Sequence, residues 1–305
     1  MKKREEQRGR LKTILLTIAS VFFVLFVIIP LTFALFDGPQ RGNVAKIPIE
    51  GPITGNGGNS FGDVAVSSSD VVEFIESADE DAQIKAILLE INSPGGSAVA
   101  SDEIAAAIKK TEKPVVAVIR EAGASGGYWI ASAADHIIAN RMSITGSIGV
   151  ISSYLEFSGL MDKYGVGYQR LVAGDRKDIG VPLRKLDDEE QKILQGKLNR
   201  IHAFFMQGVA ENRGMKMSDV EKIATGEFYL GVEALELGLV DQLGDEDTAE
   251  KYLKEKYDLE TIEYVVYQKE LGFLELLTGV VSDFFFNIGE GMASVFVKQT
   301  NQMWV

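Results

Sequence analysis

The sequence predicts an α/β protein with parallel strands, preceded by a transmembrane helix. Between residues 45 and 245, short apolar runs typical of buried strands alternate with helical stretches. Strands separated by helices pair in parallel, because each helix returns the chain to the end of the sheet from which it left. Glycine-containing turns follow several of these strands, and residues 13–36 contain no charged side chain. We therefore expect a layered α/β domain joined to a membrane anchor.

Composition narrows the chemistry that the chain can perform. With 46% hydrophobic and 25% charged residues, the 305-residue chain has the composition of a folded globular protein. Its net charge of −13 opposes binding to phosphates, so no nucleic-acid partner is expected. The absence of cysteine excludes disulfides, thiolate zinc sites, iron–sulfur clusters and thiol nucleophiles. The chain has two histidines, which are few ligands for a histidine-rich metal centre.

The apolar run at residues 13–36 is the expected membrane anchor, in contact with lipid. As a helix, its 24 residues would extend over about 36 Å, enough to cross a hydrocarbon core of about 30 Å. A cleaved signal peptide is the alternative. We favour the uncleaved anchor, because the run exceeds the usual apolar core of a signal peptide and only Thr32 to Ala34 suggests a cleavage site.

The charges before this run predict its orientation. Residues 1–12 contain six basic and two acidic side chains, a net charge of +4. Under the positive-inside rule this tail stays cytoplasmic, and the chain beyond residue 36 lies across the membrane. That exported part carries −17, which an anionic membrane surface would repel except where apolar groups dock. The expected location is the cell membrane, with a single crossing, a linker at 37–44 and an extracytoplasmic domain.

Strands and helices are expected in a regular order through this domain. They are a strand at 45–53, a loop at 54–63, a helix from Val71 after a cap at Ser69 and Asp70, a strand at 84–91, a helix at 102–110, a strand at 114–119, a helix at 125–134 and a strand at 136–139. The order is expected to recur at 148–152, 160–164 and 168–173, before one long helix at 187–213 with an acidic start. We interpret residues 45–270 as one domain.

The last 35 residues form a separate apolar tail. Residues 271–305 are rich in Leu, Phe and Val, and their four charged residues are spaced by 8, 7 and 8 positions, loosely on one side of a helix. Three interpretations stay open. The tail is a helix packed on the domain or at a subunit interface, a helix in the membrane interface, or a self-inhibitory segment that enters the active site.

Two of the glycine-containing turns lie directly after predicted strands. In parallel α/β sheets, ligand-binding and catalytic sites lie at these strand ends. Residues 92–96, Asn-Ser-Pro-Gly-Gly, let backbone N–H groups approach a ligand closely. Ser125 opens a predicted helix, with its hydroxyl at the positive helix end beside the amide of Gly126. Such amides, when preorganised, stabilise an oxyanion. By itself, however, Ser125 is better explained as a helix cap.

A serine nucleophile needs a base, and the sequence offers histidine or lysine. His136 and His202 are both interpreted as structural, because neither has a recognisable base context. Lysine replaces histidine in some hydrolases, where burial lowers its pKa toward neutrality. Ser147 and Lys177 lie in two further glycine-containing turns. By its local sequence alone, Lys177 is a solvated loop lysine.

Taken together and in order, these turns resemble the signal peptide peptidase A family, membrane-anchored serine proteases of bacteria and archaea. The resemblance covers residues 45–245 and rests on NSPGG at 92–96, ASGGYW at 124–129, ITGSIG at 144–149, GDRKDIGVP at 174–182 and TGEFYLGVEALELGLVDQLG at 225–244. It implies a crotonase/Clp-protease-like fold and a Ser–Lys mechanism without metal or organic cofactor. The implied substrates are cleaved signal peptides and other hydrophobic segments near the membrane.

Carried over by motif, the resemblance implies a role for each site residue. Ser125 would be the nucleophile and Lys177 the general base. Ser147 would orient the lysine, and the amides of Gly96 and Gly126 would bind the oxyanion. Single-domain members of the family assemble as ring- or dome-shaped oligomers, in which neighbouring subunits supply the serine and the lysine of one site. We therefore expect a homo-oligomer with shared active sites.

Two other functions stay open beside this membrane-anchored serine endopeptidase. The same fold family includes acyl-CoA-handling enzymes, whose paired amides stabilise a thioester enolate. Such an enzyme would bind CoA and use a carboxylate base, which fits poorly with an exported domain. The other alternative is a non-enzymatic scaffold tethered to the membrane. In a scaffold, Ser125 and Lys177 would never approach each other within or between subunits.

Overall fold

The computed structural model describes residues 2–28, 42–60 and 63–269. Its first helix, α1 (Lys2–Phe23), continues directly into a π-helical turn, η1 (Val24–Ile28). Among the described residues, no helix is both long enough and apolar enough to cross a membrane. The predicted anchor at 13–36 continues past residue 28, beyond the described residues, and the predicted tail at 271–305 lies wholly outside them. Both assignments stay predictions.

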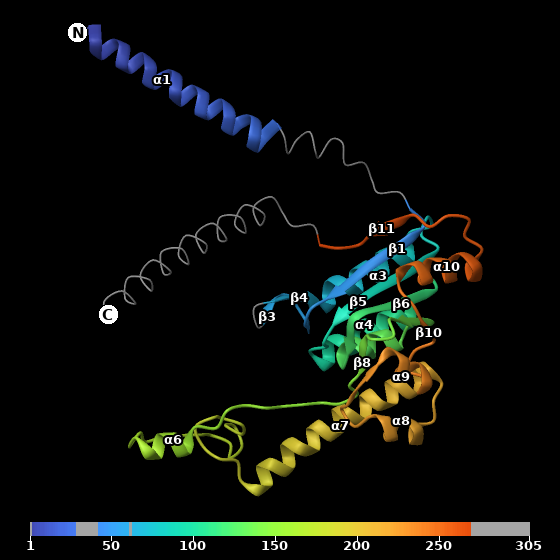
Figure 1. Ribbon diagram of the computed structural model, residues 1–305. Helices are drawn as coiled ribbons and strands as arrows, with labels where there is room; N and C mark the ends of the chain where they lie inside the picture. The colour runs from blue at the N-terminus through green and yellow to red at the C-terminus, as the bar shows by residue number, and fades with distance from the viewer. Residues whose placement is uncertain (1, 29–41, 61–62, 270–305) are drawn as a thin grey trace, which may run out of the picture.

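A parallel sheet forms the centre of the domain, as the sequence predicts (Figure 1). Six of its strands follow one another in the order β10-β7-β6-β5-β1-β11, and each neighbouring pair in this order is parallel. Because β5 and β6 are central and covered on both faces, their sequences are nearly continuous apolar runs. The bounds are β1 (Val44–Glu50), β5 (Ala86–Ser93), β6 (Val115–Ala124), β7 (His136–Ala139), β10 (Gln242–Leu243) and β11 (Tyr264–Val266).

Helices cover both faces of this sheet, and alternate strand residues pack against each layer. In β5, Ile87 and Leu89 belong to the larger apolar cluster, which also takes in Phe205 of α7. Leu88 belongs to the smaller cluster on the other face, together with Leu253 of α10. The helices of the larger cluster include α3 (Ser68–Glu80), α4 (Ala98–Lys110), α5 (Gly126–Ser132), α7 (Asp188–Arg213), α8 (Met217–Ile223) and α9 (Gly231–Glu236), and that of the smaller cluster is α10 (Glu246–Tyr257).

Strand β6 changes its neighbour halfway along its length. Residues 116–119 pair with β7, whereas residues 122–124 pair with β8. The sheet therefore divides at Arg120 and Glu121, and the end of β6 that pairs with β8 leads directly to Ser125. Strand β9 adds to β8 in antiparallel orientation, and the bounds of these two strands are β8 (Ile144–Gly146) and β9 (Phe228–Leu230).

Several predicted boundaries shift for local reasons. The predicted strand at 45–53 is divided into β1 and β2 at Gly51, which has a positive φ of 80°. The predicted loop at 54–63 contributes to a small three-stranded sheet. Helix α4 starts four residues before the predicted 102, because the hydroxyl of Ser97 caps it by accepting the N–H of Ala100. The strands of the small sheet are β2 (Ile53–Thr54), β3 (Gly58–Ser60) and β4 (Asp63–Ser67).

The long helix predicted at 187–213 is confirmed as α7. Asp187 caps its start by accepting the N–H groups of Glu189 and Glu190, and the side chain of Glu190 accepts the N–H of Asp187 in return. The helix ends at Gly214, whose φ of 61° is typical of a glycine C-cap. The acidic start and the glycine end thus define this helix in the sequence.

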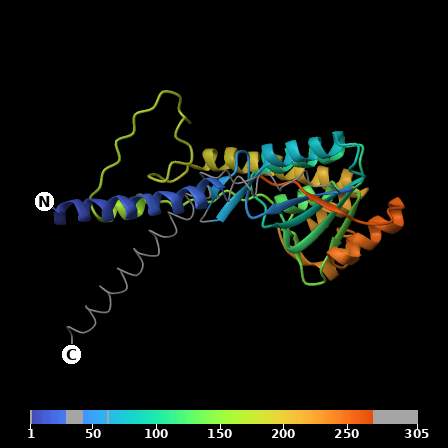
Figure 2. The same ribbon diagram turned by 90° about the horizontal axis from the view of Figure 1, so that it is seen from above.

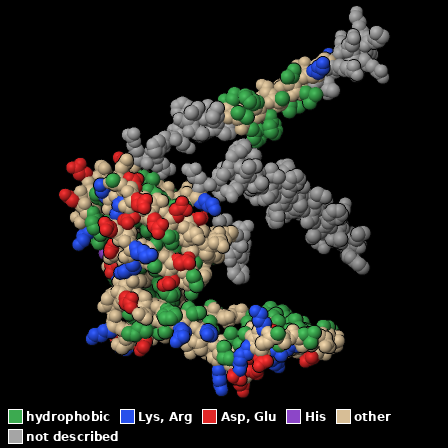
Figure 3. All heavy atoms as spheres, turned by 180° about the vertical axis from the view of Figure 1, so that it is seen from behind, with side chains coloured by type: hydrophobic (Ala, Val, Ile, Leu, Met, Phe, Trp, Pro, Cys, Tyr) green, Lys and Arg blue, Asp and Glu red, His purple; other side chains and the backbone are tan. Residues whose placement is uncertain are grey.

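The strands predicted at 148–152 and 168–173 are wrong. The chain between β8 and α7 leaves the body of the domain as an arm, which we define as residues 150–186 (Figures 1 and 2). Its only regular element is α6 (Ser158–Lys163), close to the predicted helix at 160–164. Within the described part of the chain, no strand lies beside the arm for its strand-like sequence to pair with. Many of the arm's large apolar side chains, including those of Ile151 and Leu171, are exposed, and hydrophobic side chains are visible on the surface of the arm (Figure 3).

Candidate active site

Ser125 occupies a sharp turn between β6 and α5. Its φ and ψ of 51° and −121° lie in a region that favours glycine, so the surrounding structure holds the backbone in strain. The N–H of Ser125 donates to the carbonyl of Gly146 at 2.8 Å, and its own carbonyl accepts the N–H of Trp129 at 2.9 Å. Its side chain makes no capping hydrogen bond to α5. The interpretation of Ser125 as only a helix cap is therefore wrong.

The turn after β5 lies directly against this turn. The ideal Cβ position on Gly126 is 3.2 Å from the backbone nitrogen of Gly96, so the two predicted oxyanion residues are neighbours in space. Ile53 donates to the carbonyl of Gly95 and accepts from Ser97. Ile53 and Gly96 thus form a parallel bridge, whose two hydrogen bonds involve the neighbours of Gly96 and not Gly96 itself. The N–H of Gly96 therefore points away from Ile53. The structure thus brings together the amides that sequence reasoning paired, although 30 residues separate them in the chain.

Ser147 lies in the turn after β8. It also has a positive φ, 49°, and its N–H donates to the carbonyl of Glu227 at 2.9 Å. Its hydroxyl donates to the carbonyl of Gly226 at 3.2 Å. Ser125 and Ser147 line one cavity of about 540 Å³, together with Pro94, Gly149, Val150, Ile151, Gln195, Leu198, Asn199, His202, Thr225 and Gly226.

Lys177 is not among the residues that line this cavity. It lies on the arm, where its side chain is exposed and its backbone N–H donates to the carbonyl of Gly174 at 3.0 Å. The adjacent Asp178 is held by Arg170 at 2.7 Å and by Arg184 at 3.0 Å. Hydrogen bonds from Arg170 and Arg184 keep the pKa of Asp178 well below its ordinary value. Within one chain, the structure does not bring the predicted base to the predicted nucleophile.

The two histidines have different surroundings. His136 stacks on Tyr252, with ring centroids 3.8 Å apart, and its Nε2 lies 3.2 Å from the side-chain oxygen of Gln242. Both contacts fit the structural role that the sequence predicts for His136. His202 instead lines the cavity of Ser125, and sequence reasoning missed this position. Residues 195, 198, 199 and 202 are spaced by three or four positions, which places them on one face of α7. This spacing was the sequence signal that could have assigned His202 to the cavity.

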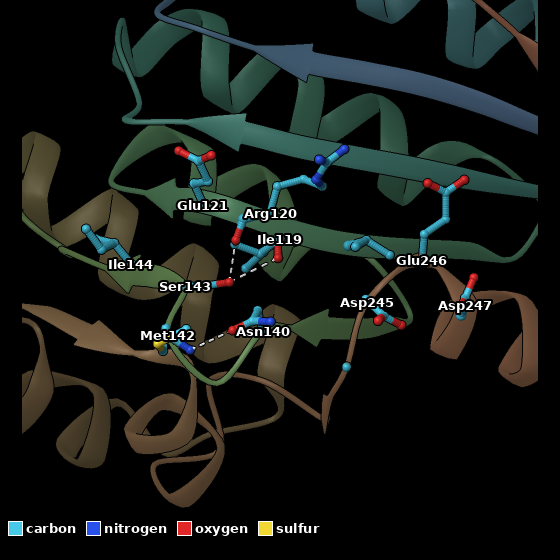
Figure 4. Close-up of a pocket in the computed structure, with 12 residues that line it drawn as sticks. Ile119, Arg120, Glu121, Asn140, Met142, Ser143, Ile144, Asp245, Glu246 and Asp247 are labelled. Carbon is cyan, nitrogen blue, oxygen red and sulfur yellow. Dashed lines mark hydrogen bonds between the residues drawn. The ribbon is translucent and has the colours of Figure 1, made fainter.

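A second and larger cavity, of about 710 Å³, lies at the division of the sheet (Figure 4). It is lined by residues of β6, the β7–β8 loop and the start of α10, and contains none of the predicted site residues. Arg120 and Glu246 on its wall belong to an ion-pair network. Within this network, Glu90 pairs with both Arg120 and Lys46, and Lys46 reaches Glu246 at 2.9 Å. The charged groups of this network are thus paired with one another.

A serine at a strand-to-helix turn of a parallel α/β sheet, beside two neighbouring backbone amides, is an arrangement typical of hydrolytic enzymes. Comparison with known proteins identifies the kind. Residues 107–260 match Peptidase family S49, and the chain belongs to this family. Membership makes the chain a protease and confirms its resemblance to the signal peptide peptidase A family.

Relatives of similar length match most of the chain. A putative protease of Methanocaldococcus jannaschii is 35% identical over 226 residues, which cover 73% of this chain and 72% of the relative. A putative signal peptide peptidase SppA of Enterococcus faecium is 37% identical over 75% of this chain and 69% of its own length. A putative protease of Synechocystis is 35% identical over 75% of this chain and 82% of its own length.

Proposed function

We propose that the chain is a membrane-anchored serine endopeptidase with a Ser125–Lys177 dyad. Its substrates are hydrophobic peptides, such as remnant signal peptides, which it cleaves at the outer face of the membrane. The observation that carries the proposal is the geometry of Ser125. A strained serine without a capping bond adjoins the paired amides of Gly96 and Gly126. A hydroxyl and two amides in this relation suit attack on a carbonyl and stabilisation of the resulting oxyanion.

The proposed reaction proceeds through an acyl-enzyme. Uncharged Lys177 takes the proton of the Ser125 hydroxyl, whose oxygen forms a bond to the peptide carbonyl carbon. The oxyanion accepts hydrogen bonds from the amides of Gly96 and Gly126. When the carbon–nitrogen bond breaks, Lys177 returns the proton to the leaving amine. Water then attacks the ester by the same proton exchange, which releases the acid and restores Ser125.

A neighbouring copy of the chain supplies Lys177 in this proposal. The arm carries Lys177 away from the domain, and it exposes large apolar side chains, including Leu155 at 72% and Leu171 at 95%. Exposed apolar surface of this kind favours burial against another protein. Contact with a second copy would cover these side chains and bring Lys177 toward Ser125 and Ser147. Burial there would also favour the uncharged amine, which a general base requires.

The location and the substrate class rest on the ends of the chain and on its relatives. An uncharged segment at 13–36 after a basic tail supports an anchor with the domain outside the cytoplasm. An enzyme anchored in this way lies close to hydrophobic peptides that are released from the bilayer, which are the proposed substrates. The printed name of the Enterococcus faecium relative, a putative signal peptide peptidase, supports the same substrate class.

The lining of the cavity counts against the acyl-CoA alternative. An enolate-forming enzyme needs a carboxylate base, and no Asp or Glu lines the cavity of Ser125 in the described part of the chain. The scaffold alternative leaves the strained φ of Ser125 without a purpose, because strain of this kind concentrates at functional sites. The serine peptidase is the function that accounts for both observations.

Mixing two inactive variants tests the proposal. Ser125→Ala and Lys177→Ala should each abolish peptide hydrolysis by the full-length, detergent-solubilised protein. When they are co-expressed, about a quarter of the sites should combine an intact serine with an intact lysine from different chains, and activity should return to about that level. Continued hydrolysis by Ser125→Ala would reject the nucleophile. Absence of recovery in an assembled mixture would reject the shared dyad.

A further inference from the structure

His202 connects α7 to the turn beside Ser125. Its Nε2 lies 3.1 Å from the carbonyl oxygen of Ile148, and the ring lines the cavity that Ser125 and Ser147 share. A carbonyl oxygen only accepts, so Nε2 carries the proton in this hydrogen bond. This hydrogen bond fixes the imidazole ring against the Ile148 carbonyl, which suits a role in alignment of the turn.

The turn that His202 contacts, residues 146–149, is also the turn that holds Ser125. The carbonyl of Ile148 accepts a second hydrogen bond, from the N–H of Gly226 at 3.1 Å. Two residues earlier, the carbonyl of Gly146 accepts the N–H of Ser125 at 2.8 Å. Ser147, between them, has a φ of 49° and stays in this conformation only because its surroundings restrain it.

We propose that His202 is a positioning residue of the peptidase, which keeps the turn at 146–149 in the geometry that aligns Ser125 and Ser147. The inference rests on the proposed function. Helix α7 is anchored by Phe205, whose ring stacks on Trp129 of α5 with centroids 4.7 Å apart. His202 lies three residues before Phe205 on the same helix. Its hydrogen bond to Ile148 therefore holds residues 146–149 against a helix whose own position is fixed. Loss of the bond should slow acylation of Ser125 and leave substrate binding largely intact.

Three variants separate positioning from a purely structural contribution. His202→Leu removes the donor and keeps an apolar side chain of moderate size. His202→Gln keeps an N–H donor near the position of Nε2. His136→Gln is the matched control, because His136 stacks on Tyr252 and lies outside the cavity. The readouts are kcat and KM for peptide hydrolysis, the rate of Ser125 labelling by a fluorophosphonate, and the midpoint of thermal unfolding, all on the full-length oligomer.

We expect His202→Leu to lower both kcat and the labelling rate by about five- to tenfold, the effect of one lost hydrogen bond, with KM changed less than about twofold. His202→Gln should regain at least about half of both rates. His136→Gln should match the wild type. If His202→Leu does not fold, His202→Asn replaces it, because the asparagine amide is one methylene shorter than that of glutamine and does not reach the Ile148 carbonyl.

Equal rates for the leucine and glutamine variants would overturn the inference, as would a rate loss no larger than the loss of folded protein. The proposed function fails differently. A wild-type protein without hydrolysis that depends on Ser125 would remove both conclusions together. Full activity of His202→Leu beside an inactive Ser125→Ala would remove only the role of His202.

Discussion

The backbone nitrogen of Gly126 lies 2.6 Å from the position that a Cβ would occupy on Gly95. The turn after β5 and the turn that carries Ser125 are therefore in contact through their backbones, with no room for a side chain between them. Gly95 also has a φ of 99°, which disfavours any other residue. This contact sets the spacing of the two amides that we assign to the oxyanion.

Gly95→Ala should therefore separate the amides of Gly96 and Gly126. We expect peptide hydrolysis to fall by about a hundredfold, the cost of losing one oxyanion donor. The kcat of the purified full-length protein measures the effect. Gly55→Ala is the matched control, because a Cβ on Gly55 meets nothing within 4 Å. Wild-type turnover by Gly95→Ala would show that these amides do not stabilise the reaction.

Ser147→Ala should reduce activity less than substitution of either residue of the proposed dyad. The hydroxyl of Ser147 donates to the carbonyl of Gly226 within one chain, and we assign it to orient Lys177 in the proposed oligomer. Loss of one hydrogen bond to the amine should lower kcat by about tenfold. Steady-state kinetics beside Lys177→Ala provide the test. A loss as complete as that of Lys177→Ala would instead make Ser147 a direct participant in proton transfer.

Arg184 should affect activity through the turn of Lys177. It joins Asp178 at 3.0 Å to Glu190 at 2.6 Å, and so ties the residue after Lys177 to the first turn of α7. Arg184→Ala should lower kcat by about tenfold, because a free turn presents the amine in many orientations. Arg184→Lys should recover part of this loss, since lysine keeps the charge without the two-pronged geometry. Unaltered kcat in both variants would mean that the arm is ordered by other contacts.

Glu90 should make the stability of the domain depend on pH. Burial acts to raise its pKa, but hydrogen bonds from Lys46 and Arg120 outweigh burial and hold the pKa below the ordinary 4.5. A carboxyl with a lowered pKa in the folded state stabilises that state above about pH 4.5, and the contribution is lost as pH falls through the lowered value. Urea unfolding between pH 7 and pH 3 measures this loss.

Glu90→Gln is the test variant for this pH dependence. It should lose about 2 kcal/mol of unfolding free energy at pH 7, because it leaves Arg120 and Lys46 with fewer charge-assisted bonds. It should also show a weaker dependence on pH. A variant that follows the wild-type curve at every pH would assign the acid transition to other carboxyls.

Much of the fold was predictable because its signals are local. The apolar runs at 84–91 and 136–139 became β5 and β7 with small changes, since buried central strands need continuous apolar sequence. Asp187 and Gly214 define α7 by capping. The predictions at 148–152 and 168–173 failed because a strand also requires a neighbour, and the arm has none among the residues that the structure describes. Strand propensity does not report whether a partner strand is present.

The sequence by itself determined the parallel α/β class, because alternating strand and helix signals are short-range patterns, and its resemblance to the family predicted the residues of the candidate site. Only the tertiary structure decided which of them meet. It brought Gly96 to Gly126 and added His202 to the cavity of Ser125, whereas it left Lys177 on the arm. The physical reason is that these relations join segments 30 or more residues apart. Distances between such segments follow from how the layers pack, which no local pattern encodes.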